Sequence, residues 1–264
     1  GKTTAIRILV GQARPTSGTA TIAGADCVRD ARKVKQLVGY MPDKFGSYDN
    51  MRVREYLDFF GAAFGMRRKD RTRRIDEVLD ITGSRYMQDR YVEALSHGMQ
   101  QRIGIARTLL HDPEVLILDE PAGGLDPAAR RDFLETSIRL LNESGSTILF
   151  SSHHMGDVER MAGRAVMLHD GKVLVDDDLD AMQERFSLLI VPHVDAGPEE
   201  DRRARLSAHP DCLAVRDRLD GWHIVIRRTP DGALAAAADL HFDNARATVL
   251  GLEELFIELA EGQS

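Results

Sequence analysis

The sequence predicts an α/β protein in which helices cover a parallel β-sheet, followed by a small C-terminal α+β domain. Two short apolar runs, Val115 to Leu118 and Thr147 to Phe150, have the length and composition of buried strands. A longer stretch with helical spacing precedes each of them, and strands that alternate with helices form a parallel sheet. After residue 178 the chain becomes a charged, alanine-rich tail of weaker strands and helices. We therefore predict one domain over residues 1–178 and an accessory domain over 179–264.

Local patterns predict the other elements of the first domain. A helix starts at Lys2, where apolar residues recur at helical spacing, and the turn Pro15-Thr16-Ser17-Gly18 follows it. Strands are predicted at Thr19–Ala23 and Leu37–Met41, and a hairpin at Arg164–Val175 that turns at Asp170-Gly171. Helices are predicted at Val53–Phe64, Arg71–Ile81, Met99–Leu110 and Pro127–Asn142. Those between about residues 44 and 112 form a helical insertion subdomain in this prediction.

Composition narrows the classes of function. A net charge of −7 and a pI near 5.7 give no general electrostatic attraction to a polyanion, so nucleic acid is not an expected partner. The two cysteines, Cys27 and Cys212, are far apart in the sequence, which predicts neither a disulfide framework nor a zinc site. No apolar run reaches the roughly 18 to 20 residues that span a bilayer. Any crossing of a membrane is therefore expected in another chain.

The first stretch that can carry chemistry is Gly1-Lys2-Thr3, at the start of the first predicted helix. This is the pattern of the end of a P-loop, where backbone N–H groups cradle phosphates, a lysine neutralises them and a hydroxyl binds magnesium. An ordinary polar helix N-terminus has the same composition. The stretch alone therefore leaves both interpretations open.

A second stretch, Asp119-Glu120, follows the apolar strand Val115 to Leu118 directly. Ligands of open α/β sheets bind at the carboxyl ends of the strands, which is where these two carboxylates lie. Asp119 can hold a magnesium ion, directly or through water, and Glu120 faces the place of an attacking water. Two acidic residues at the end of a buried strand are costly without a cation, so the pattern favours a site over a chance surface turn.

A third stretch, Leu95-Ser96-His97-Gly98-Met99, lies just ahead of a predicted helix. Ser96 and Gly98 place a hydroxyl and free N–H donors where an anion can bind. Ser96 as a simple N-cap explains the same pattern. The stretch therefore does not identify a site without its context.

Taken together, these stretches resemble the ATP-binding cassettes of the ABC family, in which a helical insertion interrupts a P-loop NTPase sheet. The five matching stretches, in the family's order, are Lys2-Thr3-Thr4 (end of Walker A), Leu95 to Met99 (signature), Val115 to Pro121 (Walker B), Gly124-Leu125-Asp126 (D-loop) and Ser151-Ser152-His153 (switch-histidine loop). Five stretches in one order are far more specific than any one of them.

The resemblance implies roles for individual residues, with ATP and Mg²⁺ as the bound groups. It implies that Gly1, Lys2, Thr3 and Thr4 bind ATP, with Lys2 on the β- and γ-phosphates, and that Thr3 and Asp119 serve magnesium. Glu120 would polarise the attacking water and His153 would contact the γ-phosphate. The neighbouring His154 competes for the histidine's role, and the position right after the paired serines favours His153.

The resemblance also implies partners. Two cassettes of the family, either identical or related, close head to tail, so that Ser96 and Gly98 of one meet the ATP of the other, with Asp126 at the interface. Asp126 as an N-cap before Pro127 is an adequate structural explanation as well. A separate transmembrane permease would hold the chain at the cytoplasmic face of the cell membrane, and Asp43 to Tyr56 is the expected coupling surface.

Four stretches look like cassettes of the drug-resistance exporter type. They are Gly39 to Tyr48, Val53 to Leu57, Ser151 to His153 and the tail stretch Leu252 to Phe256. The transported substrate would be chosen by the permease, and import remains open. The helical spacing of Leu252 to Leu259 favours core packing over a partner surface. The basic run Arg67 to Arg74 is interleaved with acids, which favours a solvated face.

The sequence departs from the family pattern in three places. Asp43 stands where the Q-loop usually has glutamine, and it is counted among the nucleotide-site residues because a carboxylate can bind magnesium or water. A merely solvated Asp43 is the alternative interpretation. His97 and Met99 replace the common glycine and glutamine of the signature. A first strand, an aromatic residue for adenine and most of the phosphate-binding glycines are expected ahead of Gly1 in the intact protein.

Two other functions remain as alternatives. A soluble ABC ATPase that acts on DNA or ribosomes would need a long coiled coil or a second cassette, and the sequence shows neither. A regulatory module that binds nucleotide without turnover does not need Glu120 or His153, and both are present. An ATPase that powers an exporter is therefore the predicted function.

Overall fold

The structure is a computed structural model, and it describes residues 1–44, 46, 50–193, 204–242 and 244–261. The chain divides into two units, Gly1–His153 and His154–Ser264. Each unit has its own sheet and its own buried core, and each is described by itself.

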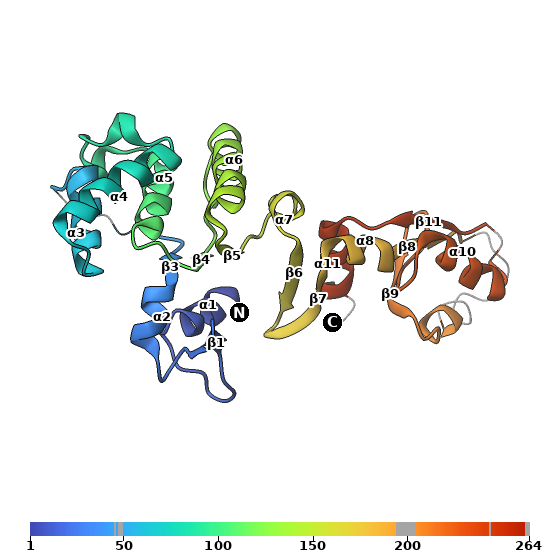
Figure 1. The fold of residues 1–264 in the computed structure, drawn as a ribbon. Coiled ribbons are helices and arrows are strands. Elements are labelled where there is room, and N and C mark those ends of the chain that lie inside the picture. Colours follow the sequence, from blue (N-terminus) through green and yellow to red (C-terminus); the bar gives the residue numbers. More distant parts are fainter. Residues whose placement is uncertain (45, 47–49, 194–203, 243, 262–264) are drawn as a thin grey trace. The chain divides into compact units, whose positions relative to one another are not determined.

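Helices and strands alternate through most of the first unit (Figure 1). Its helices are α1 (Lys2–Leu9), α2 (Ala31–Leu37), α3 (Val53–Ala63), α4 (Arg68–Ile81), α5 (His97–Leu109) and α6 (Pro127–Ser144), with 3-10 turns η1 (Arg85–Met87) and η2 (Val92–Ala94). Its strands are β1 (Thr21–Ile22), β2 (Ala25–Asp26), β3 (Val38–Met41), β4 (Val115–Leu118) and β5 (Thr147–Phe150). The sequence missed α2, since only Val34 of this charged helix is buried.

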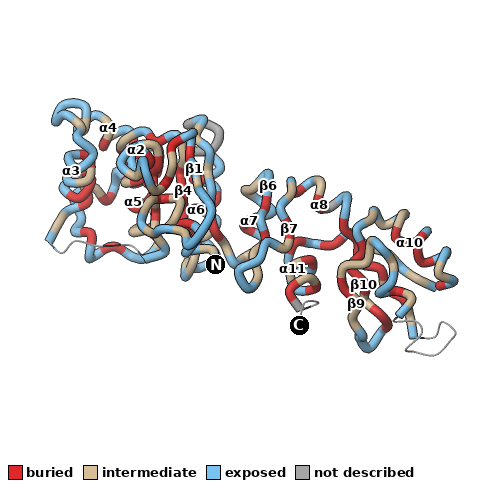
Figure 2. The backbone as a smooth tube through the Cα atoms, turned by 90° about the horizontal axis from the view of Figure 1, so that it is seen from below, coloured by how far each residue is buried: buried red, intermediate tan, exposed pale blue. Residues whose placement is uncertain are grey.

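Strands β3, β4 and β5 form a parallel sheet with β4 in the centre. Val115 aligns with Val38 on one side and with Thr147 on the other, so the three strands end at the same level. The last three residues of β4 are buried, as the apolar run predicts. Figure 2 colours the whole backbone by burial in this way. The predicted parallel α/β sheet is confirmed.

The helical insertion forms one group of helices, α3, α4 and α5, in Figure 1. Their apolar faces are buried, and three basic residues of α4, namely Arg71, Arg73 and Arg74, are paired with acids. Arg71 Nε lies 2.5 Å from Asp58 Oδ1, and Arg74 Nη2 lies 2.9 Å from Asp112 Oδ1. The basic run is therefore mostly exposed and in part paired with acids, in agreement with its interleaved acids.

The second unit has a four-stranded antiparallel sheet in the order β11-β8-β10-β9 and a separate β6–β7 hairpin. Its elements are α7 (Met155–Met161), β6 (Arg164–His169), β7 (Lys172–Asp178), α8 (Leu179–Arg185), β8 (Ser187–Val191), β9 (Cys212–Arg218), β10 (Gly221–Ile226), α10 (Pro230–Asp239), β11 (Arg246–Val249) and α11 (Leu252–Glu261). Alternate residues of a strand face opposite sides of its sheet. Thus Leu189 packs in one core with Ala236 of α10, and Leu188 packs in another with Leu255 of α11.

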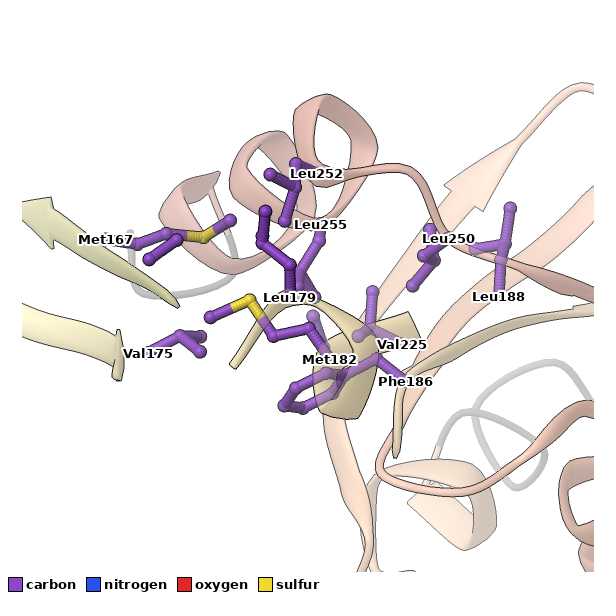
Figure 3. Close-up of a cluster of buried hydrophobic side chains, with 12 residues drawn as sticks. Met167, Val175, Leu179, Met182, Phe186, Leu188, Val225, Leu250, Leu252 and Leu255 are labelled. Carbon is purple, nitrogen blue, oxygen red and sulfur yellow. The ribbon is translucent and has the colours of Figure 1, made fainter. Parts of the chain in front are cut away.

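The second of these cores also contains the β6–β7 hairpin, which the sequence assigned to the first domain. Met167 of β6 and Val175 of β7 are buried in the same cluster as Leu179 and Met182 of α8 and Leu255 of α11 (Figure 3). The division after His153, rather than after residue 178, follows from this shared core. Helix α11 packs inward through Leu255, as its spacing predicts.

Candidate ATP-binding site

The ends of the parallel strands bring three loops together. Asp119 follows β4 and donates its N–H to the carbonyl of Met41 at 2.9 Å, one residue past the paired strands. Ser151 follows β5 and donates its N–H to the carbonyl of Leu118 at 2.9 Å. The backbone hydrogen bonds between the strands thus continue for one residue into the loops. They fix the backbone of Asp119, Glu120 and Ser151 at one edge of the sheet.

Asp119 is a buried carboxylate with one oxygen left open. Its side chain is 1% exposed, and Oδ1 accepts a hydrogen bond from Ser151 Oγ at 2.7 Å and lies 3.5 Å from Thr3 Oγ1. Oδ2 has no hydrogen-bond partner among the described residues. A buried carboxylate oxygen without a partner is costly, and a hard cation such as Mg²⁺ would satisfy it.

The residues beside Asp119 fit magnesium. The described residues contain no group of three or more His, Cys, Asp or Glu side chains suited to a metal. A Mg²⁺ ion usually takes only one or two protein ligands and completes its shell with water and substrate phosphates. The Asp119 carboxylate and the Thr3 hydroxyl are a donor set of that kind.

Glu120 lies between two cationic or hydrogen-bonding groups. Lys2 Nζ is 2.9 Å from its Oε1, and His153 Nδ1 is 2.7 Å from its Oε2. Burial acts to raise the pKa of Glu120, but the hydrogen bonds from Lys2 and His153 outweigh it and hold that pKa below its ordinary value. Glu120 is therefore a carboxylate at neutral pH.

The start of α1 supplies Lys2 to this group. Gly1 is the N-cap residue, and Lys2, Thr3 and Thr4 form the first turn, whose N–H groups have no partner within the helix. Lys2 Nζ also donates to the carbonyl oxygen of Ser152 at 3.0 Å. The helix start, the end of β4 and the end of β5 thus meet at Glu120.

Of the two neighbouring histidines, His153 has described contacts with Glu120. Its backbone N–H also lies 3.3 Å from Glu120 Oε2. His154 begins the second unit and is the N-cap residue of α7. The predicted preference for His153 therefore has a geometric basis, and its role in hydrolysis stays a prediction.

Ser96 and Asp126 both cap helices. Ser96 Oγ accepts from Met99 N at 3.4 Å at the start of α5, and Asp126 Oδ1 accepts from the N–H groups of Ala128 and Ala129, each at 3.0 Å, at the start of α6. No described hydrogen bond or ion pair joins Ser96 or Gly98 to Lys2 or Glu120 within the chain. Their proposed contact with ATP stays a prediction that needs a second cassette.

Asp43 lies beside the turn that follows Glu120. Its Oδ1 is 4.0 Å from the position that a Cβ on Gly123 would take. Part of the expected coupling surface from Asp43 to Tyr56, namely residue 45 and residues 47–49 with Tyr48, lies outside the described residues.

Ser151 has a role that the sequence analysis did not assign. Its Oγ donates to Asp119 Oδ1 at 2.7 Å and accepts from the N–H of Glu120 at 2.8 Å, so one hydroxyl orients both acidic residues. A signal was present in the sequence. Ser151 directly follows β5 as Asp119 directly follows β4, and the register pairs Leu118 with Phe150.

Comparison with known proteins agrees with this geometry. The profile of the family described as ABC transporter matches residues 1–123. The chain is 36% identical over 185 residues to the ABC transporter ATP-binding protein NatA of Bacillus subtilis, covering 70% of this chain and 75% of NatA. It is 37% identical to the bacitracin transport ATP-binding protein BcrA of Bacillus licheniformis, covering 70% of this chain and 60% of BcrA.

A solved ATP-binding subunit of an ABC transporter superposes with a TM-score of 0.61 at 28% identity, over 69% of this chain and 76% of that one. Within the described part of the chain, no helix combines the length and the apolar character that crossing a membrane requires. The predicted family, the P-loop NTPase fold and the predicted ATPase class are confirmed by these matches. The chain belongs to the ABC transporter family of ATP-binding proteins, which are ATPases.

Proposed function

We propose that the intact protein hydrolyses ATP to power an exporter whose membrane part is a separate permease. The observation that carries this proposal is the position of the Glu120 carboxylate between Lys2 and His153, beside the half-satisfied Asp119. A site that only bound nucleotide would not need a carboxylate held ionised at this place. The bacitracin transport protein among the relatives supports transport as the purpose.

Each residue of the site has a chemical task in this proposal. Glu120 accepts a hydrogen bond from the attacking water and orients it in line with the γ-phosphate. Lys2 exchanges its contact with Glu120 for the β- and γ-phosphate oxygens when ATP binds, and the first-turn N–H groups of α1 hold the same phosphates. His153 keeps Glu120 in place and reaches the γ-phosphate.

Asp119 and Thr3 would hold Mg²⁺, which when bound neutralises the phosphate charge that develops during transfer. The open Asp119 Oδ2 supports this assignment, because a cation gives it the partner that no described residue provides. Ser151 would keep the carboxylate turned so that Oδ2 stays available.

The proposed partners are a second cassette and a permease. Ser96 and Gly98 are at the start of α5, where N–H donors and a hydroxyl can meet the phosphates held by another copy, and Asp126 would lie at that interface. The stretch from Asp43 to Tyr56 is the proposed contact with the permease, which would hold the protein on the inner face of the cell membrane.

The test compares wild type with Glu120→Gln in Mg²⁺-dependent ATP hydrolysis, using the intact protein. We expect the variant to lose between about 10²- and 10⁴-fold in kcat, because it cannot accept the proton of the attacking water, and to accumulate as an ATP-bound dimer. Glu114→Gln is the matched control, since this exposed carboxylate lies at the opposite end of β4. Wild type that does not hydrolyse ATP, even with a permease present, would favour the regulatory function instead.

A further inference from the structure

One side chain ties the start of α5 to the turn that follows Glu120. His97, the first residue of α5, holds Nε2 3.0 Å from the carbonyl oxygen of Gly123. A carbonyl can only accept, so Nε2 carries the hydrogen and donates it. The buried side chain of Gln101, one helical turn along α5, lies beside the ring with its amide nitrogen 3.5 Å from the same Nε2, and because both nitrogens carry hydrogens the two make no hydrogen bond.

The two peptide groups of Gly123 connect His97 to Glu120 through hydrogen bonds. The Gly123 carbonyl accepts from His97, and the Gly123 N–H donates to the carbonyl oxygen of Glu120 at 2.9 Å. The turn is also tight. A Cβ on Gly123 would lie 3.1 Å from that Glu120 oxygen, and Gly124 beside the His97 ring has φ of 69°, which favours glycine.

Glu120 needs such support because its backbone is in a rare conformation. Its φ is 49°, in the left-handed region that a residue other than glycine occupies only when its surroundings hold it there. Ser151 Oγ holds the N–H of Glu120 at 2.8 Å, and Gly123 holds its carbonyl. The His97 bond fixes the second of these two supports.

Helix packing fixes His97 in turn. A Cβ on the next residue, Gly98, would lie 3.3 Å from Cβ of Ala129 in the first turn of α6. The starts of α5 and α6 therefore touch. This packing fixes the backbone position of His97, from which the imidazole extends to the turn.

We propose that His97 is a positioning residue for ATP hydrolysis: its hydrogen bond to Gly123 holds the Glu120–Gly123 turn, and with it the Glu120 carboxylate, in the working conformation. This inference rests on the function proposed above. It gives a task to a residue that stands where the resembled signature has glycine. His97 acts through Glu120 and does not itself touch the reacting atoms.

The test compares His97→Ala, His97→Gln and His97→Asn in the intact protein. The Gln amide nitrogen reaches about as far as Nε2 and can donate to Gly123, whereas the Asn amide is too short. We expect kcat to fall about five-fold in the Ala and Asn variants, since one hydrogen bond is lost, with KM for ATP unchanged within about two-fold. The Gln variant should keep about half of the wild-type kcat or more. Gln100→Ala, on the same helix, is the control, because the structure gives its side chain no hydrogen bond among the described residues.

A second readout separates this inference from the proposed function. Hydrogen exchange of the Gly123 N–H, which bonds to Glu120, should become at least about five-fold faster in His97→Ala and stay near wild type in His97→Gln. If the wild type does not hydrolyse ATP, the proposed function fails. The exchange rate of the Gly123 N–H then shows by itself whether the His97 hydrogen bond holds the Glu120–Gly123 turn. Unchanged exchange, an unchanged kcat in His97→Ala, or equal losses in the Ala and Gln variants would each overturn the proposal.

Discussion

Both units of the protein contain buried carboxylates, and two of these, Asp119 and Glu258, are treated in opposite ways. Asp119 in the first unit is 1% exposed and Glu258 in the second is 7% exposed. Asp119 has hydroxyl partners on one oxygen only. Glu258 is ion-paired with Arg216 Nε, and Arg218 Nη2 lies 3.4 Å from its Oε1.

This difference in partners indicates that Asp119 belongs to a binding site and that Glu258 belongs to a structural ion pair. Arg216 also donates to the carbonyls of Ile257 and Glu258 at 3.2 and 3.1 Å, so the charge in the second unit fixes α11 to β9 and is matched within the fold. The charge in the first unit is left unmatched on one oxygen, which costs stability unless a cation binds. Four predictions test or sharpen this contrast.

The largest effect is expected from Asp119→Asn. Loss of the charge should remove Mg²⁺-dependent turnover, with kcat falling about a thousand-fold. The free energy of unfolding without nucleotide should stay within about 1 kcal/mol of wild type or rise, because an incompletely paired buried charge is removed. Steady-state hydrolysis and denaturant titration measure the two quantities. A large loss of stability would mean that Asp119 is a structural residue like Glu258.

Glu258→Gln should have the opposite profile. It leaves the largely covered Arg216, whose side chain is 14% exposed, beside a neutral amide, and we expect the second unit to lose about 3 kcal/mol of unfolding free energy. Denaturant unfolding followed by the fluorescence of Trp222, which is buried in this unit, reports the loss. Glu253→Gln is the control, since Glu253 is an exposed carboxylate on the same helix. Equal stability of both variants would show that the pair contributes nothing.

Leu255→Ala tests where the two units divide. Leu255 shares its core with Met167 and Val175, so its truncation should cost about 2 to 3 kcal/mol and speed hydrogen exchange in β6 and β7 as well as in α11. Exchange in β3, β4 and β5 should not change. Ile257→Ala, at a position 39% exposed, is the control. A hairpin that stays protected would instead favour the boundary at residue 178.

The sequence predicted the first unit better than the second for a physical reason. Asp119-Glu120 after a buried strand, or Lys2 at a helix start, is a local pattern whose chemistry can be read without the rest of the chain. The hairpin's membership in the second unit depends on Leu255, some eighty residues further on, and no local pattern contains that contact. The bond from His97 to Gly123 was missed for the same reason, since it joins the start of α5 to a turn that lies some twenty-six residues further along the chain.

The smallest effect concerns the ion pairs around Glu120. Its folded-state pKa is lowered, so the stabilisation that this carboxylate provides is present above its ordinary value of 4.5 and is lost as the pH falls through the folded value. Lys2→Met removes one of the two hydrogen bonds that lower the pKa, while the burial that raises it remains. The pKa of Glu120 should therefore rise toward its ordinary value, and acidification should remove less stability from Lys2→Met than from the wild type, because the folded and unfolded pKa values lie closer together. Carboxyl NMR titration of the nucleotide-free protein measures the shift, with Lys33→Met on the exposed face of α2 as the control. An unchanged pKa would mean that the hydrogen bond from His153 alone lowers the pKa of Glu120. Asp119 would then be the carboxylate of this site whose charge still lacks a full set of partners.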